Sequence, residues 1–314
     1  MKIVLLEPIG ISKKKLEEIR NEFQENNNEF LWYSNIPEDD IEIISRCEDA
    51  DIIILSNLPL SSKIIDSCKK LKMISVAFAG VDHIVMDTCR KNDIVVCNAA
   101  AYSNHAVAEL TIGLIISLYR KIIWADKQTR QLLNREGFLG SELFGKTFGI
   151  IGTGNIGINV AKLANAFGCK VIAYSKTIKD IDNVEFHDLN YVLENSDIVS
   201  LHLPLNEKTK YLISKNELYR MKSNAILINT ARGAIVDTKA LSDVLKNRDI
   251  AGAAIDVYEN EPPLKNDNDL FNAPNTILSP HIAYATQEAI KNRGNIVIEN
   301  IKKWIDGDAQ NVIV

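Results

Sequence analysis

The strongest constraint on the fold is a repeated alternation between short apolar runs and longer amphipathic segments. The first series of apolar runs is Ile3–Leu6, Phe30–Tyr33, Asp51–Ser56, Met73–Phe78 and Ile94–Asn98. The second series is Thr147–Ile151, Lys170–Tyr174, Asp197–Leu203, Ala225–Asn229, Ala251–Val257 and Asn275–Leu278. Continuous apolar runs of this length are typical of parallel strands that are buried on both faces. The two series predict an α/β chain with two doubly wound parallel sheets.

Two other segments are predicted to be helical. Asn104–Lys121 is long, rich in Ala, Leu and Ile, and carries few charges, so we expect a buried helix between domains or against a second subunit. Thr286–Asp306 also has a helical pattern, but its periodicity does not indicate where it packs.

Composition excludes several classes of protein. A chain of 314 residues is long enough for two domains. The net charge of −5 and the pI of about 5.7 argue against a nucleic-acid or membrane surface. The most apolar stretch, Leu110–Tyr119, is too short to span a membrane. The five cysteines show no C-x-x-C spacing, which favours a reduced, cytoplasmic chain with neither a metal site nor disulfides.

A glycine-rich motif, G-T-G-N-I-G, spans residues 152–157 between an apolar run and an Ala-rich helical segment. This is the context of a dinucleotide-binding fingerprint. Gly152 allows the tight turn, Gly154 lets the backbone reach the pyrophosphate, and Gly157 lets helix and strand pack closely. We expect the pyrophosphate at the N–H groups of the helix start, near Asn155 and Ile156.

The residue that ends the following strand bears on the choice of cofactor. An acidic side chain there would accept hydrogen bonds from the adenosine ribose, but this chain has Ser175, followed by Lys176. Lys176 could pair with the 2′-phosphate of NADP. Alternatively, Ser175 binds the ribose of NAD and Lys176 is a solvated surface charge. The sequence leaves NAD and NADP open.

Three residues of complementary chemistry follow strands of the second series. They are Arg232, Glu261 and His281, and ligands of open α/β sheets bind beyond the carboxyl ends of strands. Arginine binds a carboxylate with two parallel hydrogen bonds, histidine exchanges a proton near neutral pH, and a neighbouring glutamate stabilises the imidazolium. Each could have a structural role instead, so the prediction of 2-keto-acid reduction depends on their joint placement.

Seven stretches of the chain resemble the D-isomer-specific 2-hydroxyacid dehydrogenases. They are G-V-D-H at 80–83, V-A-E at 107–109, G-K-T-F-G-I-I-G-T-G-N-I-G at 145–157, H-L-P-L at 202–205, N-T-A-R-G at 229–233, D-V-Y-E-N-E-P at 256–262 and S-P-H at 279–281. They occur in the order found in that family. The resemblance implies an oxidoreductase that transfers a hydride between NADH or NADPH and a small 2-keto acid, giving the D-2-hydroxy acid.

The resemblance also implies roles for individual residues. Arg232 would bind the substrate carboxylate and polarise its carbonyl, Glu261 would support the histidine, and His281 would be the acid/base. The backbone at Ala79 and Gly80 would hold the substrate carboxylate from the opposite domain. The other residues expected at the cofactor, besides Arg232, are Asp256 at the nicotinamide carboxamide, Thr230 and Ala231 at the nicotinamide ribose, and Val107 and Pro204.

A discontinuous architecture follows from the same resemblance. A Rossmann-type cofactor domain of residues 99–282 would be inserted into a flavodoxin-like substrate domain of residues 1–98 plus 283–314. The helix at Asn104–Lys121 is where family members pair, so we expect a homodimer. Tyr284 stands where several hydroxypyruvate (glycerate) reductases carry Trp, a weak indication of that branch.

Two other functions compete with this prediction. Some relatives sense NAD(H) without turnover, as co-repressor-like binding proteins do, but the presence of Arg232, Glu261 and His281 favours an enzyme. Formate dehydrogenase relatives carry an amide partner for the histidine, where this chain has Glu261. Glyoxylate, hydroxypyruvate and branched-chain or aromatic keto acids are all candidate substrates.

Overall fold

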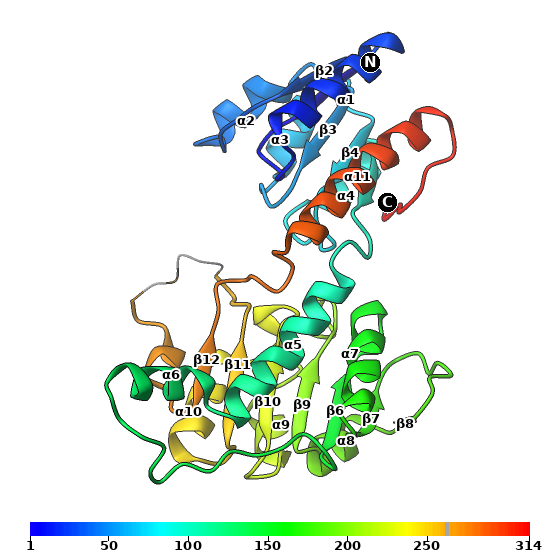
Figure 1. Ribbon diagram of the computed structural model, residues 1–314. Coiled ribbons are helices and arrows are strands. Elements are labelled where there is room, and N and C mark those ends of the chain that lie inside the picture. Colours follow the sequence, from blue (N-terminus) through cyan, green and yellow to red (C-terminus); the bar gives the residue numbers. More distant parts are fainter. Residues whose placement is uncertain (261–263, 265) are drawn as a thin grey trace. The chain divides into compact units, whose positions relative to one another are not determined.

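The computed structural model describes residues 1–260, 264 and 266–314 (Figure 1). The chain divides into two compact units, the first formed by Met1–Ser103 and Ala285–Val314, the second by Asn104–Tyr284. In the structure the units change after Ser103 and after Tyr284. The boundaries expected from the resemblance, after residues 98 and 282, lie slightly earlier in the sequence.

The first unit contains a five-stranded parallel sheet in the order β2-β1-β3-β4-β5. Its strands are β1 (Lys2–Leu5), β2 (Glu29–Trp32), β3 (Ile52–Leu55), β4 (Met73–Val76) and β5 (Val95–Asn98). Its helices are α1 (Lys13–Glu25), α2 (Asp40–Cys47), α3 (Ser62–Ser67), α4 (Met86–Lys91) and α11 (Gln287–Ile305). The strand order 2-1-3-4-5 is that of flavodoxin-like sheets, which confirms the predicted fold of this part.

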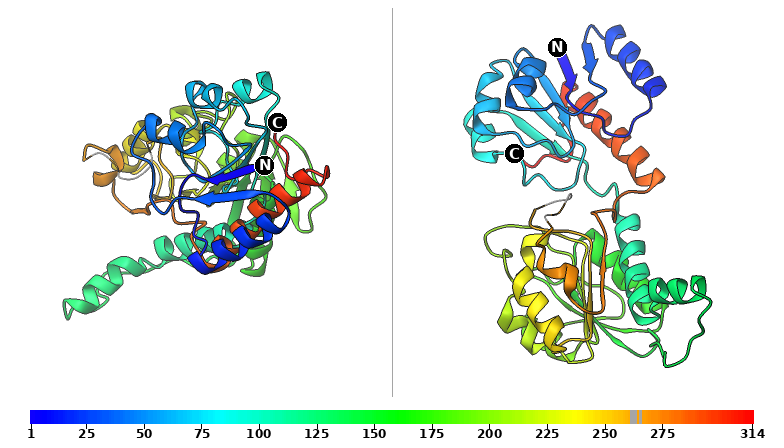
Figure 2. Two further views of the ribbon diagram at one scale, coloured as in Figure 1. Left: turned by 90° about the horizontal axis from the view of Figure 1, so that it is seen from above. Right: turned by 90° about the vertical axis from the view of Figure 1, so that its left-hand side faces the viewer.

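The C-terminal helix α11 packs on the first sheet although it follows the whole second unit in the sequence. The Ser75 hydroxyl on β4 donates a hydrogen bond to the Val297 carbonyl, 3.1 Å away. Lys302 forms an ion pair with Glu22 on α1, and α1 and α11 lie side by side in both Figure 1 and Figure 2. Buried residues on α11 and β4 therefore complete one core from two distant chain segments.

The described residues of the second unit form a seven-stranded parallel sheet in the order β12-β11-β10-β9-β6-β7-β8. The strands are β6 (Thr147–Ile151), β7 (Lys170–Tyr174), β8 (Val184–Phe186), β9 (Ile198–Leu201), β10 (Ile226–Asn229), β11 (Gly252–Ile255) and β12 (Thr276–Leu278). Counted from β6, this is the dinucleotide-binding order 3-2-1-4-5-6 with one strand added. The predicted fold class, two doubly wound parallel sheets, is confirmed.

The helices of the second unit are α5 (Asn104–Tyr119), α6 (Ile122–Arg130), α7 (Asn155–Ala166), α8 (Leu189–Asn195), α9 (Lys215–Arg220) and α10 (Thr238–Asn247). All of these except α6 contribute buried residues that cover the two faces of the sheet. Ile226 and Ile228 on β10 pack on the side of α5 and α7, whereas Leu227 packs on the side of α8, α9 and α10. The alternation of side chains along a strand explains why the run is apolar throughout.

Two elements differ from the sequence-based prediction. β8 is a three-residue edge strand, and α6 is a helix with no buried residue. Neither carries the apolar pattern from which we predicted the other elements. Figure 2 shows α6 extending away from the rest of the second unit. No helix of the described residues is both long and apolar enough to cross a membrane.

Candidate active site

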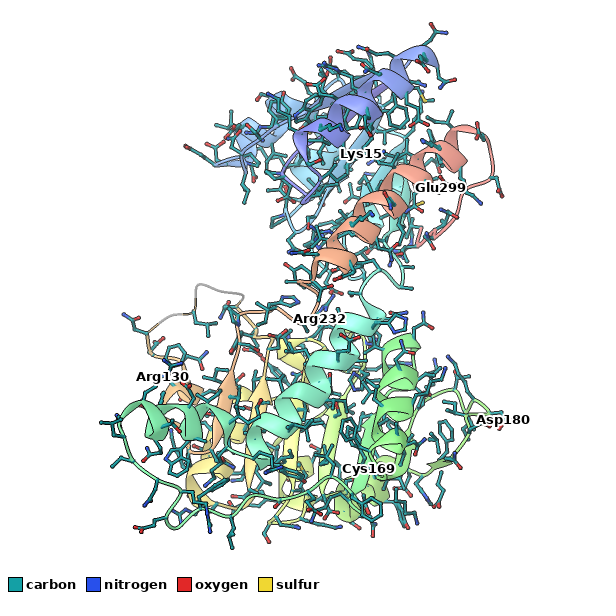
Figure 3. The ribbon with its side chains drawn as sticks, in the orientation of Figure 1. Lys15, Arg130, Cys169, Asp180, Arg232 and Glu299 are labelled. Carbon is teal, nitrogen blue, oxygen red and sulfur yellow. The ribbon has the colours of Figure 1, made fainter. Side chains whose placement is uncertain are left out.

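The predicted catalytic residues of the second unit follow adjacent strands at one edge of its sheet. Asn229 on β10, Ile255 on β11 and Leu278 on β12 are paired in one row. Because neighbouring strands are about 4.8 Å apart, the ends of β10 and β12 lie roughly 10 Å from each other. Figure 3 shows Arg232 at this carboxyl edge and Cys169, which precedes β7, at the opposite edge.

The turn that carries Arg232 is held by hydrogen bonds to Asn229, the last residue of β10. The Asn229 side-chain amide donates to the Arg232 carbonyl, 2.9 Å away, and its oxygen accepts from the Ala231 N–H at 3.0 Å. A Cβ added at Gly233 would lie 2.0 Å from the Tyr258 carbonyl carbon, so only glycine fits there. The half-buried Arg232 side chain donates from Nη1 to the Ala231 carbonyl at 2.8 Å.

His281 lies in a turn with unusual backbone geometry. Its φ of 55° falls in the left-handed region, which a residue other than glycine seldom adopts. The His281 N–H donates to the backbone carbonyls of Asp256 at 2.8 Å and Ser279 at 3.1 Å. The imidazole is half-buried and meets the Tyr284 ring edge-on, with centroids 5.3 Å apart. The fold thus fixes the backbone from which this imidazole projects.

Asp256 follows β11, between the two turns, and is fully buried. Its carboxylate accepts from the Ser279 hydroxyl at 2.6 Å, from the Ile282 N–H at 3.0 Å and from the Ala283 N–H at 2.9 Å. All three donors belong to the turn around His281. The contact between Asp256 and the nicotinamide carboxamide that the resemblance implies stays a prediction.

Three further residues belong to the predicted site, namely Glu261, Ala79 and Gly80. Glu261 lies outside the described residues. Ala79 and Gly80 belong to the first unit and follow β4, where the Ala79 carbonyl accepts from the Asn98 side-chain amide at 2.7 Å. Their substrate contacts stay predictions.

The glycine-rich motif forms the turn between β6 and α7. Gly152 has a φ of +102°, and a Cβ there would lie 2.5 Å from the His202 carbonyl oxygen. A Cβ at Gly157 would lie 2.1 Å from the Gly152 carbonyl oxygen. A Cβ at Gly154 would have no atom within 4 Å. The outer two glycines are therefore required by the protein's own packing, whereas Gly154 borders open space.

The start of α7 has the properties of a phosphate-binding helix terminus. Gly154 is its N-cap and provides no side-chain hydrogen bond, while Gly154 and Asn155 are exposed and Ile156 is half-buried. The Thr153 hydroxyl is buried and has no hydrogen-bond partner among the described residues. Free N–H groups at a helix start bind anions, so this turn fits a dinucleotide pyrophosphate.

The remaining predicted cofactor residues surround that turn or flank the Arg232 turn. The Gly152 N–H donates to the Tyr174 carbonyl at 2.8 Å, which places Ser175 beside the glycine motif. The Thr230 hydroxyl pairs with Thr111 on α5 at 3.1 Å, and Ala231 is half-buried in the same turn. Lys176 and Pro204 are exposed, while Val107 is buried on α5.

His202, directly after β9, contributes an uncharged ring beside the glycine motif. Its Nε2 lies 2.9 Å from the Ser200 hydroxyl. Burial lowers the pKa of His202 to about 3, because an imidazolium would lose its hydration. The ring is therefore neutral at physiological pH. Among the described residues, no group of three His, Cys, Asp or Glu side chains could hold a metal ion.

Sequence reasoning missed two groups of this edge, the Asn229 amide and the Thr153 hydroxyl. Both stand in motifs that we singled out, but we assigned no role to either. The available signal for Asn229 was a polar residue that ends the apolar run Ala225–Asn229, since a buried amide needs partners.

Comparisons with known proteins add independent information. The family described as D-isomer specific 2-hydroxyacid dehydrogenase, NAD binding domain, matches residues 112–283. D-3-phosphoglycerate dehydrogenase of Methanocaldococcus jannaschii is 40% identical over 280 residues, covering 87% of this chain and 53% of that protein. Glyoxylate reductase of Thermofilum pendens is 38% identical over 286 residues, covering 87% of this chain and 84% of that protein.

A solved structure covers the full length of the chain. The acyclic imino acid reductase Bsp5, in complex with NADPH and D-Arg, superimposes with a TM-score of 0.92 at 33% identity, covering 100% of both chains. This chain thus spans about half the length of the phosphoglycerate dehydrogenase and most or all of the two reductases.

Proposed function

The chain is a member of the D-isomer-specific 2-hydroxyacid dehydrogenase family, and we propose that Arg232 and His281 are the groups with which it acts on its substrate. The chain is an NAD(P)-dependent oxidoreductase whose reaction transfers a hydride between NAD(P)H and a 2-keto acid. The roles of individual residues, the substrate within this class and the assembly are proposals.

The observation that carries the proposal is the position of the two side chains on one sheet edge. Arg232 follows β10 and His281 follows β12, the two strands that flank β11 and whose ends are paired with it in one row, and both residues are half-buried. The Arg232 guanidinium binds the substrate carboxylate and stabilises the charge that develops on the carbonyl oxygen. The His281 imidazole donates a proton to that oxygen and accepts one in the reverse reaction.

Glu261 is proposed to orient the His281 ring and to stabilise its protonated form. The backbone at Ala79 and Gly80 is proposed to bind the substrate carboxylate from the first unit. These assignments are supported by the family membership and the matching motifs.

The cofactor is proposed to bind along the carboxyl edge from β7 to β12. The residues that would hold it are Gly152, Gly154, Asn155, Ile156 and Gly157 at the pyrophosphate, Ser175 and Lys176 at the adenosine ribose, and Val107, Pro204, Thr230, Ala231, Arg232 and Asp256 towards the nicotinamide. When bound, NAD(P)H supplies the hydride. The open space beside Gly154 and the unpartnered Thr153 hydroxyl support this assignment.

The substrate is proposed to be a small 2-keto acid, with glyoxylate and hydroxypyruvate as the first candidates. A glyoxylate reductase and a hydroxypyruvate reductase are among the relatives with which the chain shares 38% and 36% identity. The predicted cytoplasmic location also stays a proposal.

The homodimer expected at the helix Asn104–Lys121 is proposed to include the segment that follows it, residues 122–144. The exposed apolar side chains of this segment are Ile122, Ile123, Trp124, Leu132, Leu133, Leu139 and Phe144. A nine-residue helix without a buried face is not stable alone, and a second copy would cover these residues. Sedimentation of the wild type and of Leu139→Asp tests this, because the variant should shift the protein towards the monomer.

The decisive experiment is a keto-acid panel with NADH and with NADPH, followed through nicotinamide absorbance at 340 nm. We expect turnover of at least one small 2-keto acid and formation of the D-hydroxy acid. His281→Ala should lower kcat by about 10²–10⁴-fold and leave the affinity for NAD(P)H unchanged. Tight cofactor binding without turnover of any keto acid would instead favour the NAD(H)-sensing function.

A further inference from the structure

We infer that Asn229 and Asp256 form a buried pair of positioning residues that holds Arg232 and His281 at the edge of the sheet. The inference deepens the proposed function and depends on it, since it concerns how the two proposed catalytic side chains are fixed. Neither the Asn229 side chain nor the Asp256 carboxylate needs to touch the substrate for this role.

The two residues are neighbours on adjacent strands. Asn229 ends β10 and Asp256 follows β11, and the Asp256 N–H donates to the Asn229 carbonyl at 2.9 Å. Asn229 is 1% exposed and Asp256 0%. A buried amide and a buried carboxylate are costly unless hydrogen-bonded, and here each bonds to a turn that carries one proposed catalytic residue.

Among the described residues, the Asn229 side chain bonds to the Arg232 turn only, and the Asp256 carboxylate bonds to the His281 turn only. The Asn229 amide spans residues 231–232, through the Ala231 N–H and the Arg232 carbonyl. The Asp256 carboxylate spans residues 279–283, and the Asp256 carbonyl accepts the His281 N–H. His281 has a left-handed backbone, and such a conformation persists only where the surroundings impose it. Asp256 provides those surroundings.

The first unit shows that a similar arrangement can be purely structural. The buried Glu7 carboxylate follows β1 and accepts from the N–H groups of Ser56, Asn57 and Leu58, at 2.7, 3.0 and 3.0 Å. That turn follows the neighbouring strand β3 and contains no titratable side chain. The test must therefore separate a carboxylate that only stabilises a turn from one that acts through His281.

Asp256→Asn retains the shape of the side chain but replaces an acceptor by a donor that faces N–H groups. We expect kcat for the keto acid to fall about 10–100-fold, because misplaced reacting groups cost factors of this size. Asp256 is also a proposed nicotinamide residue, so the KM for NAD(P)H should rise, but by a smaller factor than kcat falls. A rise in that KM with unchanged kcat would overturn the inference, because Asp256 would then act on the cofactor alone.

The double variant Asp256→Asn/His281→Ala distinguishes an effect of Asp256 through His281 from a general loss of stability. If Asp256 acts through His281, adding Asp256→Asn to His281→Ala should lower the residual kcat by no more than about twofold, because coupled residues are non-additive. A full additional 10–100-fold loss would overturn the inference. Full activity of His281→Ala alone would instead refute the proposed function, so the two failures are distinguishable.

Asn229→Ala should show the complementary pattern. Release of the Arg232 turn should raise the KM for the keto acid about tenfold or more, with little change in the KM for NAD(P)H. An unaltered keto-acid KM and kcat would contradict the role of Asn229.

Asp197→Asn is the matched control, because it makes the same substitution at the opposite edge of the same sheet. Asp197 accepts from the Thr147 N–H at 2.9 Å and from Lys222 at 3.2 Å. The Asp197→Asn variant should have a lower unfolding temperature and unchanged kinetic constants.

If Asp256→Asn fails to fold, Ser279→Ala is the alternative variant, because it removes only the hydroxyl that donates to Asp256. We expect it to lower kcat two- to fivefold and to leave the cofactor KM unchanged. Unchanged kcat in Ser279→Ala would then overturn the inference.

Discussion

The two halves of the seven-stranded sheet end differently at the same edge. β6 leads into the glycine turn, where Gly154 and Asn155 are exposed and open space lies beside Gly154, and β7 leads into Ser175. β10, β11 and β12 lead into turns whose backbone is held by the buried side chains of Asn229 and Asp256. The difference indicates that the two halves have different tasks. The half with the glycine turn suits a large anionic ligand, which backbone N–H groups can bind, and the half with Arg232 and His281 suits proton transfer, which needs side chains in fixed positions. Changes in the first half should alter cofactor affinity, and changes in the second half should alter turnover.

Arg232→Lys is expected to have the largest effect, and it tests the half formed by β10–β12. A lysine keeps the charge but not the planar fork, so kcat/KM for the keto acid should fall by about 10²–10³-fold. The dissociation constant of NAD(P)H, measured by fluorescence titration, should change by a much smaller factor, although Arg232 is also proposed to lie towards the nicotinamide. Arg248→Lys, at an exposed position on the opposite edge, is the control and should have wild-type kinetics. A larger loss in cofactor affinity than in kcat/KM would contradict the assignment of turnover to the half formed by β10–β12.

Gly157→Ala tests the other half, where a Cβ would lie 2.1 Å from the Gly152 carbonyl oxygen. Overpacking against backbone should cost about 3 kcal/mol, which lowers the unfolding temperature by roughly 10 °C. Gly154→Ala is the paired control, because its Cβ meets no atom of the protein within 4 Å. It should keep the wild-type unfolding temperature and raise only the KM for NAD(P)H. Equal destabilisation by both variants would contradict this assignment.

His202 lies where the two halves meet, and its half-buried, desolvated ring should make stability depend on pH. The folded-state pKa of about 3 is below the ordinary value of 6.5, so between these values the unfolded chain binds a proton that the folded chain does not. Stability is therefore unaffected above pH 6.5 and falls as the pH decreases, by about 1–2 kcal/mol at pH 5. Urea unfolding of His202→Gln should show a shallower loss between pH 7 and 5. His105→Gln, at an exposed site on α5, should keep the wild-type slope.

Ser175→Asp should have the smallest effect and concerns only the choice of cofactor. A carboxylate there would accept from the ribose hydroxyls and repel a 2′-phosphate. The ratio of kcat/KM for NADH to that for NADPH should rise about tenfold, a difference of about 1.4 kcal/mol, with the keto-acid KM unchanged. Lys176→Ala should weaken NADPH alone if the ammonium binds the phosphate. An unchanged ratio in both variants would show that this strand end does not select the cofactor.

The elements that the sequence predicted well are those with a buried apolar face. The central strands are largely apolar because helices cover both faces of the sheet. β8 and α6 were not predicted because neither has a buried apolar face. β8 has three residues at a sheet edge, with none of them buried, and α6 has no buried residue either. Without burial within the chain, no apolar periodicity arises.

The sequence by itself determined the doubly wound fold class, the glycine turn and the types of side chain at the strand ends. These features depend on local patterns, since a strand, a turn and its end residues are contiguous in the chain. The residue pattern did not place α11, which the resemblance alone assigned to the first domain and which the tertiary structure shows packed on the first sheet. Only the tertiary structure decided that Asn229 and Asp256 hold the turns of Arg232 and His281. Strand order and hydrogen bonds join residues far apart in sequence, and their partners are fixed only when the sheet has formed.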